Sequence, residues 1–181
     1  MDALPTLYTE RLILRPLTLD DAEGIQQQFA HWEVVRYLNA LVPWPYPADG
    51  ARTYLENIAL PAIAQGREWH WSIRLKQAPE QLIGNVSLMD EQDNNRGFWL
   101  GPQWQGQGLM AEASEAVTEY WFSVLKRPLM RVPKAAPNRA SRRISEKAGM
   151  RLIRREEGLF VEGAFPKDIW EMTREAWLAR R

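Results

Sequence analysis

The order of the expected elements predicts an α/β (α+β) fold: a mixed, mostly antiparallel central sheet with helices on both faces. Three strand-like runs between 69 and 100 are joined by polar turns, which is typical of consecutive antiparallel strands. A long amphipathic pattern follows from 109 to 125. The glycine-containing loop before it lies mid-chain, whereas a Rossmann unit carries its glycines after the first strand. One mixed domain over residues 1–181, without Rossmann order, is therefore expected.

The N-terminal part is expected to begin with a strand and a helix. Leu12 and Leu14 alternate in a short strand that stops at Pro16. Thr18 and Asp21 then have the spacing of a capping box, which predicts that a helix begins here.

The next segment is aromatic and rich in proline. Prolines at 43, 45 and 47 exclude regular structure from 41 to 47. A second helix is expected from about Pro47 or Asp49, with Tyr54, Leu55 and Ile58 on its inner face and a kink or end at Pro61.

Strands and helices alternate through the remainder of the chain. Trp69, Trp71, Ile73 and Leu75 alternate with polar residues, which predicts a half-buried strand. Gly149 is expected to end a short basic helix. The further elements are strands at 82–89, 96–100, 130–135, 150–153 and 169–173, and helices at 109–125 and 138–147.

Composition excludes several classes of function. The chain has 181 residues, 45% of them hydrophobic, which suffices for one packed core. Lys plus Arg equals Asp plus Glu at 23 each, so no net field attracts nucleic acid or an anionic membrane. Without cysteine there are no disulfides and no cysteine nucleophile. No signal-like or bilayer-length apolar segment is seen, so a cytoplasmic protein is expected.

The loop Gln103-Trp104-Gln105-Gly106-Gln107-Gly108 carries the strongest functional signal. It follows the apolar run 98–100 and opens onto the long helix. Glycines allow close approach to backbone N–H groups, and the positive end of the helix dipole favours an anion such as a diphosphate. The alternative is a turn that only joins a strand to a helix.

Three segments together resemble the GNAT superfamily of acetyl-CoA-dependent N-acetyltransferases, and within it the RimJ/RimL-like branch. The run 9–16, Thr-Glu-Arg-Leu-Ile-Leu-Arg-Pro, is similar to the opening strand of that branch. The loop 103–108 fits the signature Q/R-x-x-G-x-G/A. Asn138-Arg139-Ala140-Ser141 and the run 146–150 are similar to the block N-x-x-S…E-K-x-G-F, with methionine replacing phenylalanine. A last strand ending in Trp177 also resembles the branch.

The resemblance implies acetyl-CoA as donor and a splay between the two central strands, the one ending at Leu100 and the one near Ala135. The pantetheine arm would lie in that gap, and Pro133 fits a strand whose pairing is interrupted. Asn138 would bind the cofactor, cap its helix, or do both. The implied cofactor-binding residues are Phe98, Trp99, Leu100, Gln103, Trp104, Gln105, Gly106, Gln107, Gly108, Leu109, Met110 and Asn138.

Acetyl transfer from a thioester to an amine needs an acid for the thiolate and a base for the amine. The resemblance assigns the acid to Ser141, with Ser145 as alternative on the same helix face. Members of the family often carry a glutamate as base on the strand before the glycine loop. In this sequence Asn95-Arg96 occupies that stretch, so the glutamate is missing. Asp168 is one candidate, and the alternatives are Glu162, Glu91, ordered water, His31 and His70. Two histidines alone make no metal site, so no metal is expected.

The acceptor is expected to be a small-molecule amine or a protein N-terminus, taken up by direct transfer because no cysteine could carry the acyl group. Aromatic walls from Trp44, Tyr46, Trp69 and Trp71, with the region 160–166, are expected to bound its pocket. We expect a monomer or homodimer with no nucleic-acid or membrane partner. A catalytically silent acyl-CoA-binding module is the competing hypothesis, because the carboxylate near Arg96 is missing.

Overall fold

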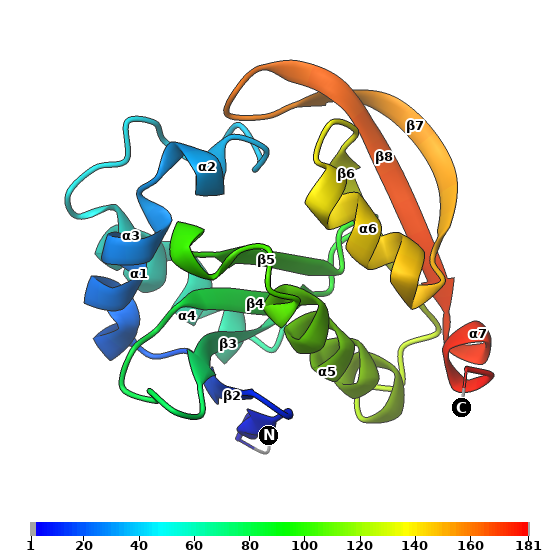
Figure 1. The fold of residues 1–181 in the computed structure, drawn as a ribbon, viewed down its shortest axis with the longest axis horizontal. Helices are drawn as coiled ribbons and strands as arrows, with labels where there is room; N and C mark the ends of the chain where they lie inside the picture. Colours follow the sequence, from blue (N-terminus) through cyan, green and yellow to red (C-terminus); the bar gives the residue numbers. More distant parts are fainter. Residues whose placement is uncertain (1–2, 181) are drawn as a thin grey trace.

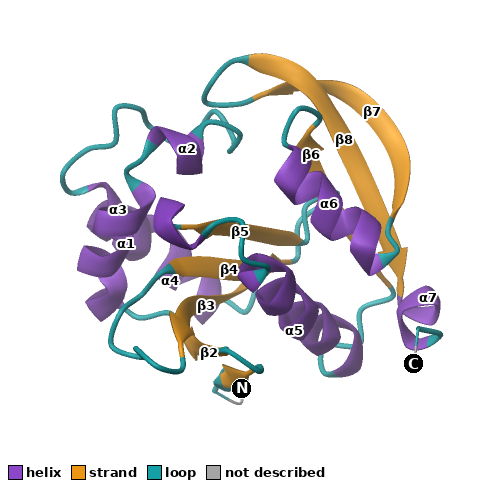
Figure 2. Ribbon diagram, viewed as in Figure 1, coloured by secondary structure: helices purple, strands orange, loops and turns teal. Residues whose placement is uncertain are grey.

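The computed structural model describes residues 3–180, and these form two antiparallel sheets with helices packed around them (Figures 1 and 2). One sheet holds β1 to β5 in chain order, and the other has the order β6-β8-β7. The strands are β1 (Leu7–Tyr8), β2 (Leu12–Pro16), β3 (Glu68–Leu75), β4 (Gly84–Met89), β5 (Arg96–Leu100), β6 (Leu129–Ala135), β7 (Arg151–Leu159) and β8 (Ala164–Thr173). The longer helices are α1 (Ala22–Phe29), α5 (Leu109–Ser123) and α6 (Arg139–Ala148), and the shorter ones are η1 (Leu19–Asp21), α2 (Trp32–Val35), α3 (Gly50–Tyr54), η2 (Leu55–Ala59), α4 (Leu60–Ala64), η3 (Pro102–Trp104) and α7 (Arg174–Leu178).

The predicted capping box is confirmed. The backbone N–H of Thr18 donates to Asp21 Oδ2 at 2.9 Å, and η1 leads into α1. Ile25 and Phe29 of α1 are buried, and they lie one helical turn apart on one face.

The second helix differs from the prediction in its inner face. It continues through Pro61 to Ala64, because its middle turn, η2, is π-helical and absorbs the missing proline N–H. This wider turn rotates the face that follows it. Leu55 and Ala59 are buried, whereas Tyr54 and Ile58 are 36% and 57% exposed.

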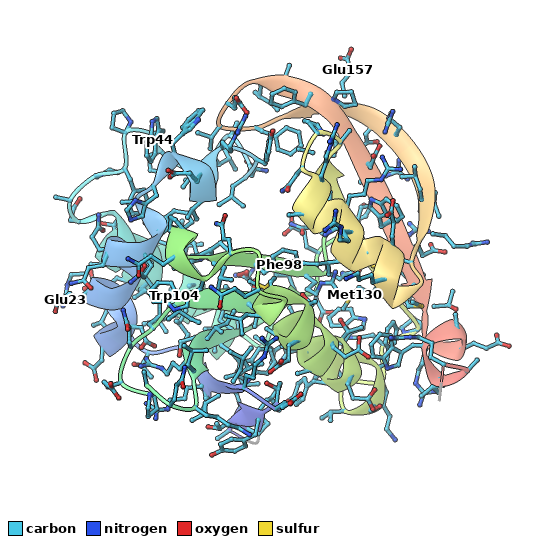
Figure 3. The ribbon with its side chains drawn as sticks, in the orientation of Figure 1. Glu23, Trp44, Phe98, Trp104, Met130 and Glu157 are labelled. Atoms are coloured by element: carbon cyan, nitrogen blue, oxygen red, sulfur yellow. The ribbon has the colours of Figure 1, made fainter. Side chains whose placement is uncertain are left out.

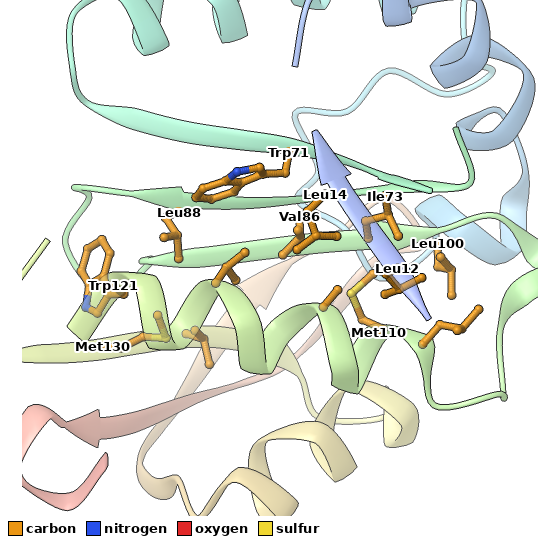
Figure 4. Packing of buried hydrophobic residues seen from close by; sticks show 14 of the residues in the cluster. Leu12, Leu14, Trp71, Ile73, Val86, Leu88, Leu100, Met110, Trp121 and Met130 are labelled. Atoms are coloured by element: carbon orange, nitrogen blue, oxygen red, sulfur yellow. The ribbon is translucent and has the colours of Figure 1, made fainter. Parts of the chain in front are cut away.

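Strand β3 is buried on both faces, so the prediction of a half-buried strand is wrong. Its apolar face packs on α5, where Trp71 lies near Leu14, Val86 and Leu88 (Figure 4). Its polar face carries the buried side chains His70, Ser72 and Arg74. They are covered because the helices between β2 and β3 pack on this side of the sheet, where Arg74 Nη2 lies 2.6 Å from Asp21 Oδ1.

The two sheets meet only where β5 and β6 begin, and the strands then diverge. The backbone N–H of Asn95 donates to Arg131 O at 2.8 Å, and the N–H of Arg131 donates to Asn95 Oδ1 at 2.9 Å. No ladder joins β5 to β6 within residues 3–180. The predicted splay is therefore confirmed. Pro133 lies inside the continuous ladder of β6 with β8, paired with Ile169, so on that side the expected interruption is wrong. Pairing is missing only on the other side of β6, the sheet edge that faces the gap.

Asn95 holds the vertex of this splay, so Asn95→Ala is expected to destabilise the fold by about 2–3 kcal/mol, because buried groups that lose a hydrogen bond cost about 1–3 kcal/mol each. Its Nδ2 donates to Met89 O at 3.0 Å and to Glu91 O at 2.9 Å. Urea unfolding measures the loss, and Asn94→Ala is the control, since the Asn94 amide makes one long contact of 3.4 Å with Glu91. Equal free energies of unfolding for the two variants would contradict the role of Asn95.

The hairpin of β7 and β8 is longer than predicted, and its tip returns to the N-terminal helices (Figure 1). Val161 N donates to Leu38 O at 3.0 Å, and Arg36 forms an ion pair with Glu162 at 2.8 Å. Trp177 belongs to α7 and not to a last strand, contrary to prediction. Within 3–180, no helix has the length and apolarity that a membrane span requires.

Candidate active site

A cavity of about 620 Å³ lies between β5 and β6 and reaches the N-terminal helices. Phe98 and Trp99 line it from β5, and the strand segment 132–135 lines it from β6. Asn138 and Ser141 of α6 border one end, and Phe29 and Tyr54 border the other. The gap between the diverging strands is therefore continuous with a second, aromatic compartment.

The loop 103–108 is exposed and shaped for an anion. Gly106 and Gly108 have φ of +77° and +78°, which glycine adopts without strain. A Cβ added at Gly106 would meet no atom within 4 Å, so the space beside it is open. Gly108 is the N-cap of α5, and as a glycine it offers no side chain to accept from the first N–H groups of that helix. This geometry fits a diphosphate at the positive end of a 15-residue helix.

Arg11 connects this loop to the start of the first sheet. Its Nη1 donates to Gln107 O at 3.0 Å, and its Nε donates to Glu112 Oε1 at 2.9 Å. Thr9 also donates to the carboxylate of Glu112. The pKa of Glu112 is lowered, because these hydrogen bonds outweigh the desolvation of the carboxyl group. The acidic residue in the first turn of α5 is thus held by Arg11 and Thr9.

Ser141 faces the cavity from the first turn of α6. Asn138 caps that helix, accepting a hydrogen bond on Oδ1 from Ser141 N at 3.3 Å. The Ser141 hydroxyl accepts a hydrogen bond from Lys134 Nζ at 2.5 Å. The cap therefore holds the backbone of Ser141, and Lys134 holds its hydroxyl.

Two buried cations border the gap, one on each strand. Arg96 on β5 and Lys134 on β6 are 4% and 6% exposed. Burial lowers the pKa of Arg96 to about 10. Burial, with the positive charge of Arg96 nearby, lowers the pKa of Lys134 well below its ordinary value. Phe98 lies between them, with Lys134 Nζ 4.8 Å and Arg96 Cζ 5.8 Å from its ring centroid.

Two of the predicted catalytic residues lie outside the cavity. Ser145 is fully buried and does not line the cavity, and its Oγ has no hydrogen-bond partner among the described residues. Asp168 is 1% exposed, does not line the cavity, and holds Arg155 through two hydrogen bonds of 2.6 and 2.9 Å. The structure therefore brings neither Ser145 nor Asp168 to the cavity, because one faces the interior and the other is held in a bidentate ion pair.

None of the four aromatic residues expected in the acceptor pocket lines the cavity. Trp71 is buried on the α5 side and donates to Pro5 O at 2.9 Å, and Trp69 packs on Trp121. Trp44 packs at a tilted angle against Trp32 in the outer N-terminal region, far from Phe98 in Figure 3. Tyr46 packs on Phe29, and burial raises its pKa to about 12. The aromatic lining comes instead from Phe29, Tyr37, Tyr54, Phe98, Trp99 and Phe160.

Of the other groups considered for the base, His70 and Glu91 line the cavity. His70 Nε2 lies 3.4 Å from Glu68 Oε1, and its Nδ1 lies 3.4 Å from Asn85 Nδ2. Glu162 is paired with Arg36, and His31 Nε2 contacts Gln27 O. The alternation of side chains along β3 could have indicated that His70 lies at the cavity, because it places His70 on the face of the strand opposite to the tryptophans. Sequence reasoning missed Lys134 altogether.

The fold and the glycine loop define a class of acetyltransferases. The model of the acetyltransferase (GNAT) domain matches residues 11–151. An uncharacterized N-acetyltransferase p20 of Bacillus licheniformis is 33% identical, with 67% of this chain and 68% of that protein covered. The probable N-acetyltransferase YjcK of Bacillus subtilis is 27% identical over 91% and 92% of the two chains.

Solved structures have the same fold. RimL, described as a ribosomal L7/L12 alpha-N-protein acetyltransferase in complex with coenzyme A, superposes with a TM-score of 0.79 at 16% identity, covering 95% of this chain and 99% of that one. A ribosomal-protein-S5-alanine acetyltransferase from Vibrio fischeri gives 0.80 at 14% identity, covering 96% and 98%. The chain belongs to the GNAT acetyltransferase family. It is an N-acetyltransferase.

Proposed function

We propose that residues 1–181 act as one acetyltransferase domain that transfers the acetyl group of acetyl-CoA directly to a small primary amine. The observation that carries this proposal is the aromatic side of the cavity. Phe160 and Tyr37 line it there, and the hairpin tip is hydrogen-bonded to the segment 36–40 at this side. An aromatic compartment bounded in this way suits a small, flat or cationic acceptor.

The residues fit the donor at two points. The N–H groups of the loop 103–108 and of Leu109 and Met110 would hold the diphosphate. The edges of β5 and β6 would flank the pantetheine arm, with Phe98 and Trp99 on one side. Leu100 O already accepts from Gln105 Nε2 at 2.9 Å, so it serves to shape the loop. When bound, the donor supplies an activated thioester, and the chain orients it.

Ser141 is placed to protonate the departing sulfur, because its hydroxyl borders the gap where the thioester end would lie. The acceptor approaches from the compartment that holds His70 and Glu91. No residue in this scheme carries the acetyl group covalently, so donor and acceptor are bound together.

A protein N-terminus is the second candidate acceptor, and with it membership of the RimJ/RimL-like branch. It is favoured by the similarity in fold to RimL and to the S5-alanine enzyme. Glu91, exposed at the rim of the cavity, is suited to bind an N-terminal ammonium group.

The test is release of free thiol from acetyl-CoA in the presence of a panel of small amines and N-terminal peptides. We expect acceptor-dependent release with small aromatic or cationic amines. Release with peptides alone would identify the second candidate. Tight acetyl-CoA binding without acceptor-dependent thiol would instead support a silent acyl-CoA-binding module.

A further inference from the structure

We propose that Lys134 is the proton donor of Ser141, so that the leaving thiolate is protonated by a serine and lysine pair and not by the serine alone. This inference rests on the proposed acetyl transfer and concerns how its leaving group is stabilised. It starts from a buried amino group that nothing in the scheme above requires.

The contacts of Lys134 point to Ser141. Its Nζ lies 2.5 Å from Ser141 Oγ and 4.8 Å above the Phe98 ring, and the residue lines the cavity. No carboxylate lies within ion-pair distance of this Nζ among residues 3–180. A long cationic side chain without a counter-ion is costly to bury, so a functional reason for it is expected.

The other charged groups near Lys134 form their hydrogen bonds and ion pairs with partners other than Lys134. Asp168, beside it in the register of β6 with β8, is held by Arg155. Lys167 and Glu156, on the strands beyond, pair with each other at 3.3 Å. Arg96 on β5 donates to Thr118 Oγ1 at 2.9 Å and adds positive charge. A negative charge that develops beside Ser141 would therefore find in Lys134 a cation that no carboxylate among residues 3–180 neutralises.

The proton movement balances without an added reactant. Attack by the acceptor nitrogen forms the C–N bond, and the electrons of the breaking C–S bond pass to sulfur. Ser141 Oγ gives its proton to the sulfur and takes one from the Lys134 ammonium, which becomes a neutral amine. The acceptor nitrogen loses its extra proton to water, and water reprotonates Lys134 after the products leave. A depressed pKa suits this role, because a donor works best when its pKa is near the working pH.

Lys134→Met tests the proposal, because methionine fills similar space without a proton. We expect kcat to fall by roughly 10²-fold, as is typical when general acid catalysis is lost. KM for acetyl-CoA should change little. The fall in the native rate at alkaline pH, caused by deprotonation of Lys134, should be absent from the variant. Lys167→Met is the matched control from the same cavity, and its pH profile should remain native.

Donor chemistry provides a further readout. With S-phenyl thioacetate, whose thiol is more acidic, the leaving group needs less help. The ratio of native to Lys134→Met rates should therefore shrink. An unchanged ratio would overturn the proposal.

Thermal stability gives a readout that does not depend on activity. Lys134→Met should raise Tm at neutral pH, because a buried cation without a partner is removed. Since the pKa of Lys134 is lowered in the folded chain, the unfolded chain binds more protons, and native stability rises with pH up to about 10.4, the pKa of a free lysine. The gain in Tm should accordingly shrink as pH rises.

The outcomes separate the two proposals. If Lys134→Met and Lys134→Gln both lower Tm and reduce kcat and kcat/KM without changing the pH profile, Lys134 is structural and this proposal fails alone. If the native chain acetylates an amine and both Lys134 variants are fully active, the Lys134 proposal also fails alone. If the native chain binds acetyl-CoA but acetylates no amine, the proposed function is contradicted, and the proposed role of Lys134 fails with it.

Discussion

Replacing Gly106 with valine is expected to raise KM for acetyl-CoA by about 100-fold or more. The side chain would enter the open space beside the loop, where no atom lies within 4 Å, and would obstruct the diphosphate. Losing even one or two hydrogen bonds to a charged group, at about 1.5–3 kcal/mol each, accounts for a change of this size. Steady-state kinetics with acetyl-CoA as the varied substrate measure it.

The matched control for Gly106→Val is Gly66→Val, since Gly66 has a similar φ of +71° and lies outside the cavity lining. Both variants should lose about 1–3 kcal/mol of stability through backbone strain. Only the Gly106 variant should lose affinity for the donor. If the two variants bind acetyl-CoA equally well, the loop is not the diphosphate site.

Ser141→Ala is expected to lower kcat by about 10²- to 10³-fold, because the sulfur loses its proton donor, and to leave KM for acetyl-CoA within a small factor. Lys134 also loses its hydrogen-bond acceptor in this variant, so the effect should not add to that of Lys134→Met. Single-turnover measurement of free thiol separates this loss from slow product release.

Ser145→Ala is the control for Ser141→Ala on the same helix. Its hydroxyl is buried without a partner in the described chain, so removing it should leave kcat unchanged and stability equal or slightly higher. If Ser145→Ala reduced kcat while Ser141→Ala did not, the roles of the two serines would be reversed.

Local chemistry made much of the fold predictable. The capping box at Thr18, the antiparallel strands from β3 to β5 and the glycine that ends α6 each depend on nearby residues. The splay was predicted from the resemblance. What the sequence could not provide is which surfaces become covered, because burial depends on contacts between distant segments. The polar face of β3 therefore looked exposed, although helices cover it.

The same reason explains the errors in the candidate site. Alternation in β3 predicts that Trp69 and Trp71 share a face, but not that α5 covers that face. The helical spacing of Ser141 and Ser145 was correct, yet only one of them borders the gap. Lys134 was missed because a lysine in a short strand resembles an ordinary solvent-exposed residue until the strand beyond it is placed.

The contacts of Arg11 imply an order of assembly. They join residues 96 and 101 positions apart in the chain, so the segment before β2 must dock before Gln107 and Glu112 are fixed. Closing so long a loop is a slow, entropically costly step that local helix formation does not need. Donor affinity should thus appear late in refolding, after most helical signal has returned, and would report completion of the native topology.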